Sequence, residues 1–275
     1  MNAQAAAKQA DVSAPIVLRE DKSGIAILTL NRPAARNSLS EAMLQALSEA
    51  LAAIARERSV RVVILAANGP AFCAGHDLKE IDAHRKDVDR GRAYFERIMA
   101  LCSQAMQQIV RLPQPVIAAV QATATAAGCQ LVASCDLAIA SHAAKFATPG
   151  VNIGLFCSTP MVALTRNVSP KHAMEMLLTG DLITAEDAAR IGLVNHVVTA
   201  GSEPAEALAL AEKIAAKSML TVKIGKEAFY RQAEMTLAEA YKYASEVMVE
   251  NMLARDAEEG IGAFIEKREP KWQDR

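Results

Sequence analysis

The sequence predicts an α/β fold, in which strands and helices alternate through about the first 200 residues and helices alone follow. Strand-sized apolar runs rich in β-branched residues recur between helical segments. The segments that join these runs are long enough for crossovers, which favours parallel pairing. From residue 203 onward, apolar residues recur almost purely at helical spacing. We therefore expect a flexible tail over residues 1–13, an α/β core over 14–200 and a helical C-terminal region over 201–275.

The strands of the predicted core follow one another in chain order. The first is the buried run at residues 24–30, which a proline turn ends. The second ends at the turn signal Asn68-Gly69-Pro70. The sequence thus predicts five strands, over residues 24–30, 60–67, 115–120, 136–140 and 193–198.

Helices are predicted between and behind these strands. Ser40 stands at an N-cap position, and behind it one helical face is formed by Leu44, Leu47, Leu51 and Ile54. A longer helix is expected over residues 88–110. In the C-terminal region, apolar residues between 237 and 248 repeat at helical spacing, and a final helix is expected over 256–264.

The composition excludes several classes of protein. The 275 residues are 52% hydrophobic with a net charge of −1, which argues against disorder and against nucleic acid as a partner. The apolar runs are far too short to span a membrane. The first 13 residues carry one Lys and no Arg, and they lack the apolar core of a secretory signal. We therefore expect a cytoplasmic protein.

The cysteines do not form a recognisable framework. Their number is odd, they are scattered, and no C-x-x-C pair occurs among Cys73, Cys102, Cys129, Cys135 and Cys157. We expect them to be small buried residues, and we expect no metal site.

Three loops follow predicted strands, where α/β proteins usually bind ligands. The first, residues 31–40, carries Arg32 and Arg36, which are either phosphate-binding groups or solvated surface arginines. The other two, residues 69–80 and 121–136, are rich in small residues, and each leads into a helix. Helix starts offer free N–H groups that suit an anionic oxygen. Facing each other, these two loops would form an oxyanion hole from main-chain groups.

Six ordered blocks carry a family resemblance: LNRPAARNSL, AFCAGHDLKE, PVIAAVQATATAAGCQLVASCDLAIAS, KFATPGVNIG, MEMLLTGDLITAEDAARIGLVNHVV and EGIGAFIEKR. Together they resemble the crotonase (enoyl-CoA hydratase/isomerase) superfamily over nearly the whole chain. Within it, AAGCQLVASCDLAIAS and FATPGVNIGLFCSTP closely resemble the branch called enoyl-CoA hydratase domain-containing protein 3. The resemblance implies a spiral of ββα units with a helical C-terminal trimerisation region, assembled as homotrimers or as hexamers of two trimers. It also implies an acyl-CoA thioester ligand, with coenzyme A as part of the substrate and no permanently bound cofactor.

The resemblance assigns the site residue by residue. The thioester carbonyl would lie between the N–H of His76 and the N–H of Ala127. Arg32 or Arg36, and Lys267, would bind the CoA phosphates. Phe264 would lie near the acyl or adenine end of a neighbouring subunit. The rest of the CoA path would be lined by Ala74, His76, Asp77, Leu78 and Lys79.

The chain departs from the hydratase pattern at both catalytic carboxylates. Gln130 stands where hydratases of the family carry one glutamate, and Gly150 stands where they carry the second. Hydration needs groups that change protonation near neutral pH, and neither residue can do so. The segment LFCSTPMVALTR, which walls the acyl pocket, is also altered and one residue shorter. Ala127 replaces a glycine, and its methyl group is harmless if φ is helical but costly if φ is positive.

Several readings of function therefore stay open. The nominal activity is that of an enoyl-CoA hydratase, a lyase, without its acid–base pair. An alternative is another acyl-CoA reaction, such as decarboxylation, thioester hydrolysis or isomerisation. A third is a non-catalytic acyl-CoA-binding or regulatory protein.

Other polar residues near these motifs also have two readings. His76 is either a general base or a side chain that points out of the site while its N–H serves, and we favour the second. Cys157 is either a nucleophile facing the acyl group or a packed loop thiol, and we again favour the second. Asp77 is expected to cap the next helix, and Asp136 to tie neighbouring backbone together. Asn152 either binds ligand or bonds a loop carbonyl.

Overall fold

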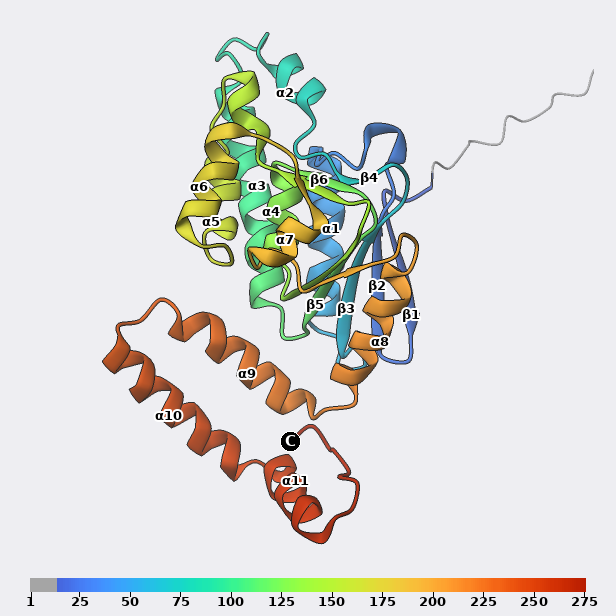
Figure 1. Ribbon diagram of the computed structural model, residues 1–275, viewed down its shortest axis with the longest axis vertical. Coiled ribbons are helices and arrows are strands. Elements are labelled where there is room, and N and C mark those ends of the chain that lie inside the picture. The colour runs from blue at the N-terminus through green and yellow to red at the C-terminus, as the bar shows by residue number, and fades with distance from the viewer. Residues whose placement is uncertain (1–13) are drawn as a thin grey trace, which may run out of the picture.

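The computed structural model describes residues 14–275, and the predicted tail at 1–13 lies outside the described residues. The main sheet has the strand order β1-β2-β3-β5-β7-β10 (Figure 1). Its strands are β1 (Val17–Lys22), β2 (Ile25–Leu30), β3 (Val62–Ala67), β5 (Val116–Val120), β7 (Leu137–Ser141) and β10 (His196–Val198). All neighbouring pairs are parallel except the β1–β2 hairpin. The α/β fold and the parallel pairing are confirmed.

The five predicted strands are confirmed as β2, β3, β5, β7 and β10, with boundaries that differ by at most three residues. The one strand of the main sheet that was not predicted is β1. Its sequence is VLREDK, and its side chains are half-buried at the start and exposed after that. An edge strand of this kind carries charges instead of a buried apolar run, so it gives no hydrophobic signal.

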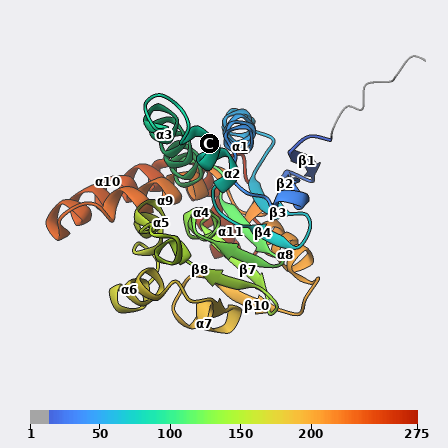
Figure 2. The same ribbon diagram turned by 90° about the horizontal axis from the view of Figure 1, so that it is seen from above.

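A second sheet, with the order β4-β6-β8-β9, was also not predicted. Figure 2 labels two of its strands, β4 and β8. It consists of β4 (Ala71–Cys73), β6 (Thr123–Thr125), β8 (Lys145–Ala147) and β9 (Ile183–Thr184). Strands of two or three residues are too short to show an alternating pattern. The strands β4, β6 and β8 run parallel to one another, so their carboxyl ends meet at one edge.

Helices cover both faces of the main sheet. On one side the core is formed with α1 (Glu41–Ile54), α3 (Arg92–Arg111) and α4 (Ala127–Ser134). On the other side α8 (Glu203–Ala215) packs Ala207 and Ala211 against the strands. The remaining helices before α8 are η1 (Pro33–Ala35), α2 (Leu78–His84), η2 (Pro149–Ile153), α5 (Ser158–Leu164), α6 (Pro170–Thr179) and α7 (Ala185–Arg190).

Two helix starts show how local sequence sets the boundaries. Ser40 caps α1, because its Oγ accepts a hydrogen bond of 3.1 Å from the N–H of Met43, which confirms the prediction. The helix predicted over 88–110 begins only at Arg92. The reason is Gly91, which stands at the N-cap with φ of 88°, outside the helical region.

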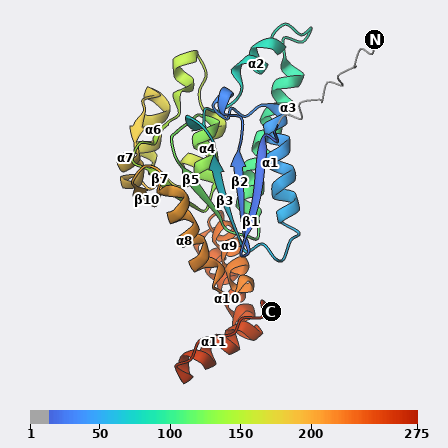
Figure 3. The ribbon, with the colours of Figure 1, turned by 90° about the vertical axis from the view of Figure 1, so that its right-hand side faces the viewer.

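After residue 203 the regular elements are all helices, as predicted. Beyond α8, the chain continues as α9 (Met219–Gln232), α10 (Leu237–Leu253) and α11 (Arg255–Glu266). These three helices form an arm that extends away from the sheets (Figures 1 and 3). No helix of residues 14–275 is both long and apolar enough to cross a membrane. The boundaries proposed at residues 13 and 200 stay predictions.

A largely buried ion pair attaches the arm to the core. Lys226 of α9 lies 2.7 Å from a carboxylate oxygen of Asp136, and it also donates to the carbonyl oxygens of Ile109 and Gln114 at 3.0 Å. Asp136 accepts further hydrogen bonds from the hydroxyl of Tyr230 and from the N–H of Val116. Asp136 therefore ties neighbouring backbone together, as expected, and it also holds α9.

Candidate functional site

The second sheet brings the predicted site segments together. The segment from Gly75 to Asp77 follows β4, the segment at Ala126 and Ala127 follows β6, and the segment from Thr148 to Gly150 follows β8. Because β4, β6 and β8 are adjacent parallel strands, all three segments emerge at the same edge. The sequence predicted the loops without the sheet that gathers them.

The loops after β4 and β6 are in direct contact. A Cβ added to Gly75 would lie only 3.4 Å from the backbone nitrogen of Ala127 and 2.9 Å from the methyl carbon of Ala126. In the described part of the chain, neither the N–H of His76 nor that of Ala127 donates a hydrogen bond. For Ala127 this follows from its place as the first residue of α4, where an N–H has no intrahelical acceptor. Two free main-chain donors are thus carried by adjoining loops.

The backbone strain in this turn falls on Ala126, one residue before Ala127, where the sequence raised the question. Ala127 is helical, so its methyl group is harmless. Ala126 instead has φ of 51° and ψ of −120°, a conformation that glycine adopts more easily. Its N–H donates to the carbonyl of Ala147 at 2.9 Å, which holds the turn against β8. The sequence pattern alone did not indicate that Ala126, and not Ala127, would have the positive φ.

Gly128 is the residue that lets α4 approach β4. A Cβ at this position would lie 2.1 Å from the carbonyl oxygen of Cys73, well inside any tolerated contact. The close approach places the first turn of α4 against the end of β4, where the loop to His76 begins. Glycine is therefore required here for packing.

Gln130 is buried in α4 with 5% of its surface exposed. The thiol of Cys102, on α3, donates to the amide oxygen of Gln130 at 4.0 Å. The amide nitrogen of Gln130 donates to no group within residues 14–275. Sequence reasoning missed Cys102, because a contact between residues 28 positions apart leaves no local signal.

The ring of His76 is enclosed by the protein. Both ring nitrogens are buried and have no hydrogen-bond partner among the described residues. Burial lowers the pKa of His76, because the charged imidazolium would lose its hydration. The ring is therefore neutral at pH 7, and the expectation that it points out of the site stays a prediction.

The position of the second family glutamate is closed by the loop that follows η2. A Cβ on Gly150 would lie 2.7 Å from the carbonyl oxygen of Leu155 and 2.9 Å from Sγ of Cys157. The thiol of Cys157 is 7% exposed, and burial raises its pKa. A thiol with a raised pKa is a poor nucleophile, so the structure favours the packed-thiol reading of Cys157.

The other predicted CoA-binding residues differ in their exposure and in whether they already form an ion pair within the protein. Asp77 caps α2 through the N–H of Lys79 at 3.0 Å, as expected, and it forms an ion pair of 2.6 Å with Arg32. Burial raises the pKa of Asp77, but these hydrogen bonds outweigh it and hold the pKa below its usual value. Arg32 is therefore already paired, whereas Arg36 is exposed and forms no ion pair with a described residue. Ala74, Leu78 and Lys79 are exposed around the same loop, as is Asn152 on η2.

Phe264 and Lys267 are not brought to the site within one chain. Both are exposed at the end of α11, and α11 lies at the opposite end of the molecule from α2, β4 and β6 (Figure 1). Their predicted contacts with a CoA ligand would require a second copy of the chain.

The cysteines are all free and buried, as expected. Within residues 14–275, no group of three or more His, Cys, Asp or Glu side chains could hold a metal ion.

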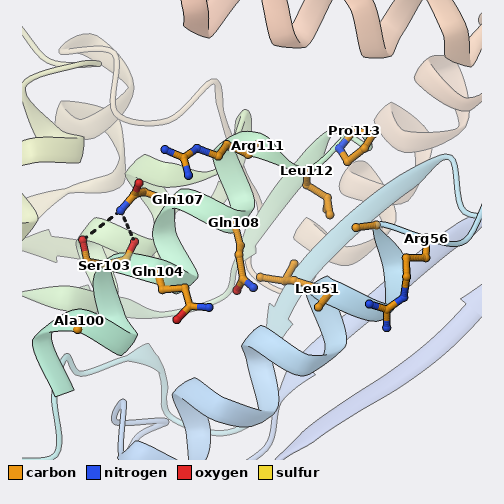
Figure 4. Close-up of a pocket in the computed structure, with 12 residues that line it drawn as sticks. Leu51, Arg56, Ala100, Ser103, Gln104, Gln107, Gln108, Arg111, Leu112 and Pro113 are labelled. Atoms are coloured by element: carbon orange, nitrogen blue, oxygen red, sulfur yellow. Dashed lines mark hydrogen bonds between the residues drawn. The ribbon is translucent and has the colours of Figure 1, made fainter. Parts of the chain in front are cut away.

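A groove of about 750 Å³ lies elsewhere, between the C-terminal halves of α1 and α3 (Figure 4). Its only ionisable lining groups are the guanidinium groups of Arg56 and Arg111, and Gln107 bonds Ser103 within it. A groove without a titratable acid, base or thiol offers no acid–base chemistry. It is lined by Leu51, Ala52, Ala55, Arg56, Ala100, Ser103, Gln104, Gln107, Gln108, Arg111, Leu112 and Pro113.

Comparison with known proteins places this chain in a family. The enoyl-CoA hydratase/isomerase family model matches residues 20–275. The rat protein named enoyl-CoA hydratase domain-containing protein 3, mitochondrial, is 47% identical over 251 residues, which cover 91% of this chain and 82% of the rat protein. A crystal structure of an enoyl-CoA hydratase from Mycobacterium smegmatis is 52% identical with a TM-score of 0.89, covering 94% of this chain and 99% of that one. The crystal structure of human enoyl-CoA hydratase domain-containing protein 3 is 46% identical, also with a TM-score of 0.89, covering 94% and 100%. The resemblance seen in the sequence blocks, including its narrower branch, is confirmed.

The expected cytoplasmic location is wrong by this comparison. The relatives from rat, frog, human and zebrafish are all named mitochondrial. The expectation rested on the charge of the first 13 residues and on overall composition, and the composition of a folded domain does not fix its compartment.

Proposed function

The chain belongs to the enoyl-CoA hydratase/isomerase family, and on that premise we propose that it binds acyl-CoA thioesters and polarises their carbonyl group without fast hydration. The observation that supports binding is the pair of free main-chain N–H groups on adjoining loops, at His76 and Ala127. Two such donors aimed at one oxygen form an oxyanion hole, which stabilises the charge that develops on a thioester oxygen. The start of α4 adds positive dipole character at the same point.

Slow hydration is proposed because the site lacks a group that exchanges a proton near neutral pH. Gln130 carries an amide, Gly150 carries no side chain, and the enclosed ring of His76 is held neutral by burial. General acid–base catalysis contributes about 10²–10⁴-fold to such reactions, so its loss leaves little rate. The polarised thioester could still serve a reaction that needs only enolate or oxyanion stabilisation.

We also propose assembly as trimers or as hexamers of two trimers. The arm formed by α9, α10 and α11 leaves many large apolar side chains in water, and exposure of this extent is typical of an interaction surface. A second copy would also be needed to bring Phe264 and Lys267 to a CoA ligand. The apolar residues that are more than half exposed on the arm are Phe229, Leu237, Tyr241, Met248, Val249, Met252, Leu253, Ile261, Phe264 and Ile265.

Two measurements test the proposal. Crotonyl-CoA loses its ultraviolet absorbance on hydration, and thermal unfolding reports binding of CoA thioesters. We expect turnover close to that of buffer together with a clear rise in Tm. Fast bleaching would contradict the proposed loss of hydration, and an unchanged Tm would contradict binding. Light scattering tests the assembly, where a mass near the 29.4 kDa of one chain would contradict a trimer.

A further inference from the structure

The amide of Gln130 is held in one orientation. Its oxygen accepts from the thiol of Cys102, which is fully buried on α3. A protonated thiol can donate to the oxygen but not to the NH₂ group, and burial keeps this thiol protonated by raising its pKa to about 12. The end of the amide that remains free is therefore the NH₂ group.

Gln130 lies on the side of the helix that carries Ala127 and its free N–H. Gln130 is three residues beyond Ala127 in α4, and residues at this spacing share one helical face. Helical side chains also slant toward the N-terminus, so Gln130 extends back toward the free N–H of Ala127. Gly150 has no side chain, so it supplies no side-chain hydrogen-bond acceptor. The site thus presents hydrogen-bond donors to both the thioester oxygen and the neighbouring part of the acyl chain.

We infer that the site selects acyl groups that carry a carbonyl oxygen on the β-carbon, namely 3-oxoacyl or malonyl-type thioesters. This inference rests on the proposed function. A glutamate at position 130 would be an acceptor, which suits a water molecule or a hydroxyl group. The oriented amide of Gln130 is a donor, which suits an oxygen that only accepts. An enoyl or saturated acyl group has no oxygen at this carbon and gives the NH₂ group no acceptor.

The size of the expected preference follows from one hydrogen bond. A net hydrogen bond formed on binding strengthens affinity about five- to tenfold. We expect acetoacetyl-CoA and malonyl-CoA to bind about five- to tenfold more tightly than butyryl-CoA and crotonyl-CoA. A 3-hydroxybutyryl group, which both donates and accepts, should lie between them.

Isothermal titration of the full-length protein with these five thioesters tests the inference, with each thioester checked for integrity by chromatography afterwards. Gln130→Met keeps the length of the side chain and removes the donor, so it should abolish the preference of acetoacetyl-CoA and malonyl-CoA over butyryl-CoA. Cys102→Ala should reduce the preference, because the amide is then free to turn. Gln104→Met, an exposed glutamine on α3, is the matched control and should keep it.

The outcomes separate this inference from the proposed function. Equal affinity of the parent protein for all five thioesters, or a preference that survives Gln130→Met, would overturn the inference and leave acyl-CoA binding intact. Absence of binding by every thioester would overturn the proposed function itself. A preference for acetoacetyl-CoA alone or for malonyl-CoA alone supports the inference and identifies which class the site accepts.

Discussion

Returning a glutamate to position 150 tests whether the loop after η2 has closed over the second carboxylate position. In Gly150→Glu the new Cβ would lie 2.7 Å from the carbonyl oxygen of Leu155, where ordinary contact begins at 3.4 Å. The loop would have to move by about 0.7 Å, and overpacking of this kind costs about 1–3 kcal/mol. At roughly 2–4 °C per kcal/mol for a chain of this size, we expect Tm to fall by roughly 2–12 °C.

The same displacement predicts how activity responds. Gln130→Glu adds a single carboxylate, and Gln130→Glu combined with Gly150→Glu adds the second on a shifted backbone. A catalytic group misplaced by about 1 Å can lose about 10²-fold in rate. We therefore expect both variants to bleach crotonyl-CoA less than about tenfold faster than the parent protein, far below the 10²–10⁴-fold that well-placed groups supply.

Two further variants separate crowding from added charge. Ser158→Glu places a carboxylate on the exposed first residue of α5, directly after the same loop, and the free energy of unfolding should change by less than about 0.5 kcal/mol. Cys157→Ala combined with Gly150→Glu removes the contact with Sγ but keeps the contact with Leu155, so it should recover only part of the lost stability. A Gly150→Glu protein that unfolds at the parent's Tm, or a double glutamate variant with a 10²-fold gain in rate, would refute the reasoning.

Three other predictions concern stability. Lys226→Met leaves the largely buried carboxylate of Asp136 without its cation, and we expect it to cost about 3–5 kcal/mol in urea unfolding. The change Lys223→Met, at an exposed position of the same helix, should cost little, and equal effects would contradict the role of the ion pair. Ala126→Gly should raise stability by about 0.5–2 kcal/mol, because it removes backbone strain that exceeds the entropic cost of glycine, and a lower Tm would show that the turn is unstrained. The pKa of Asp77 is lowered in the folded state, so its contribution is complete well above pH 3.8 and is lost as pH falls below that value. Asp77→Asn should flatten the fall in Tm below about pH 4, and an unchanged acid limb would contradict this.

Much of the main sheet was predictable because its strands are long and apolar. The runs that became β2, β3, β5 and β7 are buried on both sides, and such strands give the strongest signal in a sequence. The second sheet gave no such signal. Its strands have at most three residues, and each exists only because a neighbour in space supplies the hydrogen bonds. The sheet that positions the site was therefore the part that periodicity missed.

The site shows the same division between local and distant causes. The loops at residues 69–80 and 121–136 could be recognised from small residues and helix starts, and the roles of His76 and Ala127 came from a resemblance. The contact of Cys102 with Gln130, and the closure of the loop around Gly150, join segments far apart in the sequence. Such contacts depend on the packing of α3, α4 and η2, which a single sequence does not record.

The free donors at positions 76 and 127 belong to the main chain, and this affects how the protein tolerates mutation. A change of side chain at either position cannot delete an N–H group, unless the new residue is proline. What must be preserved is the path of the backbone, which depends on the close fit of Gly75 and Gly128 against their neighbours. A scan of all substitutions should therefore find that binding is lost at 75 and 128 even with small side chains, whereas at 76 and 127 proline should be among the most damaging residues. Catalytic side chains can therefore change during evolution while the main-chain donors are retained. A lineage can lose one reaction and gain another and still bind the same ligand.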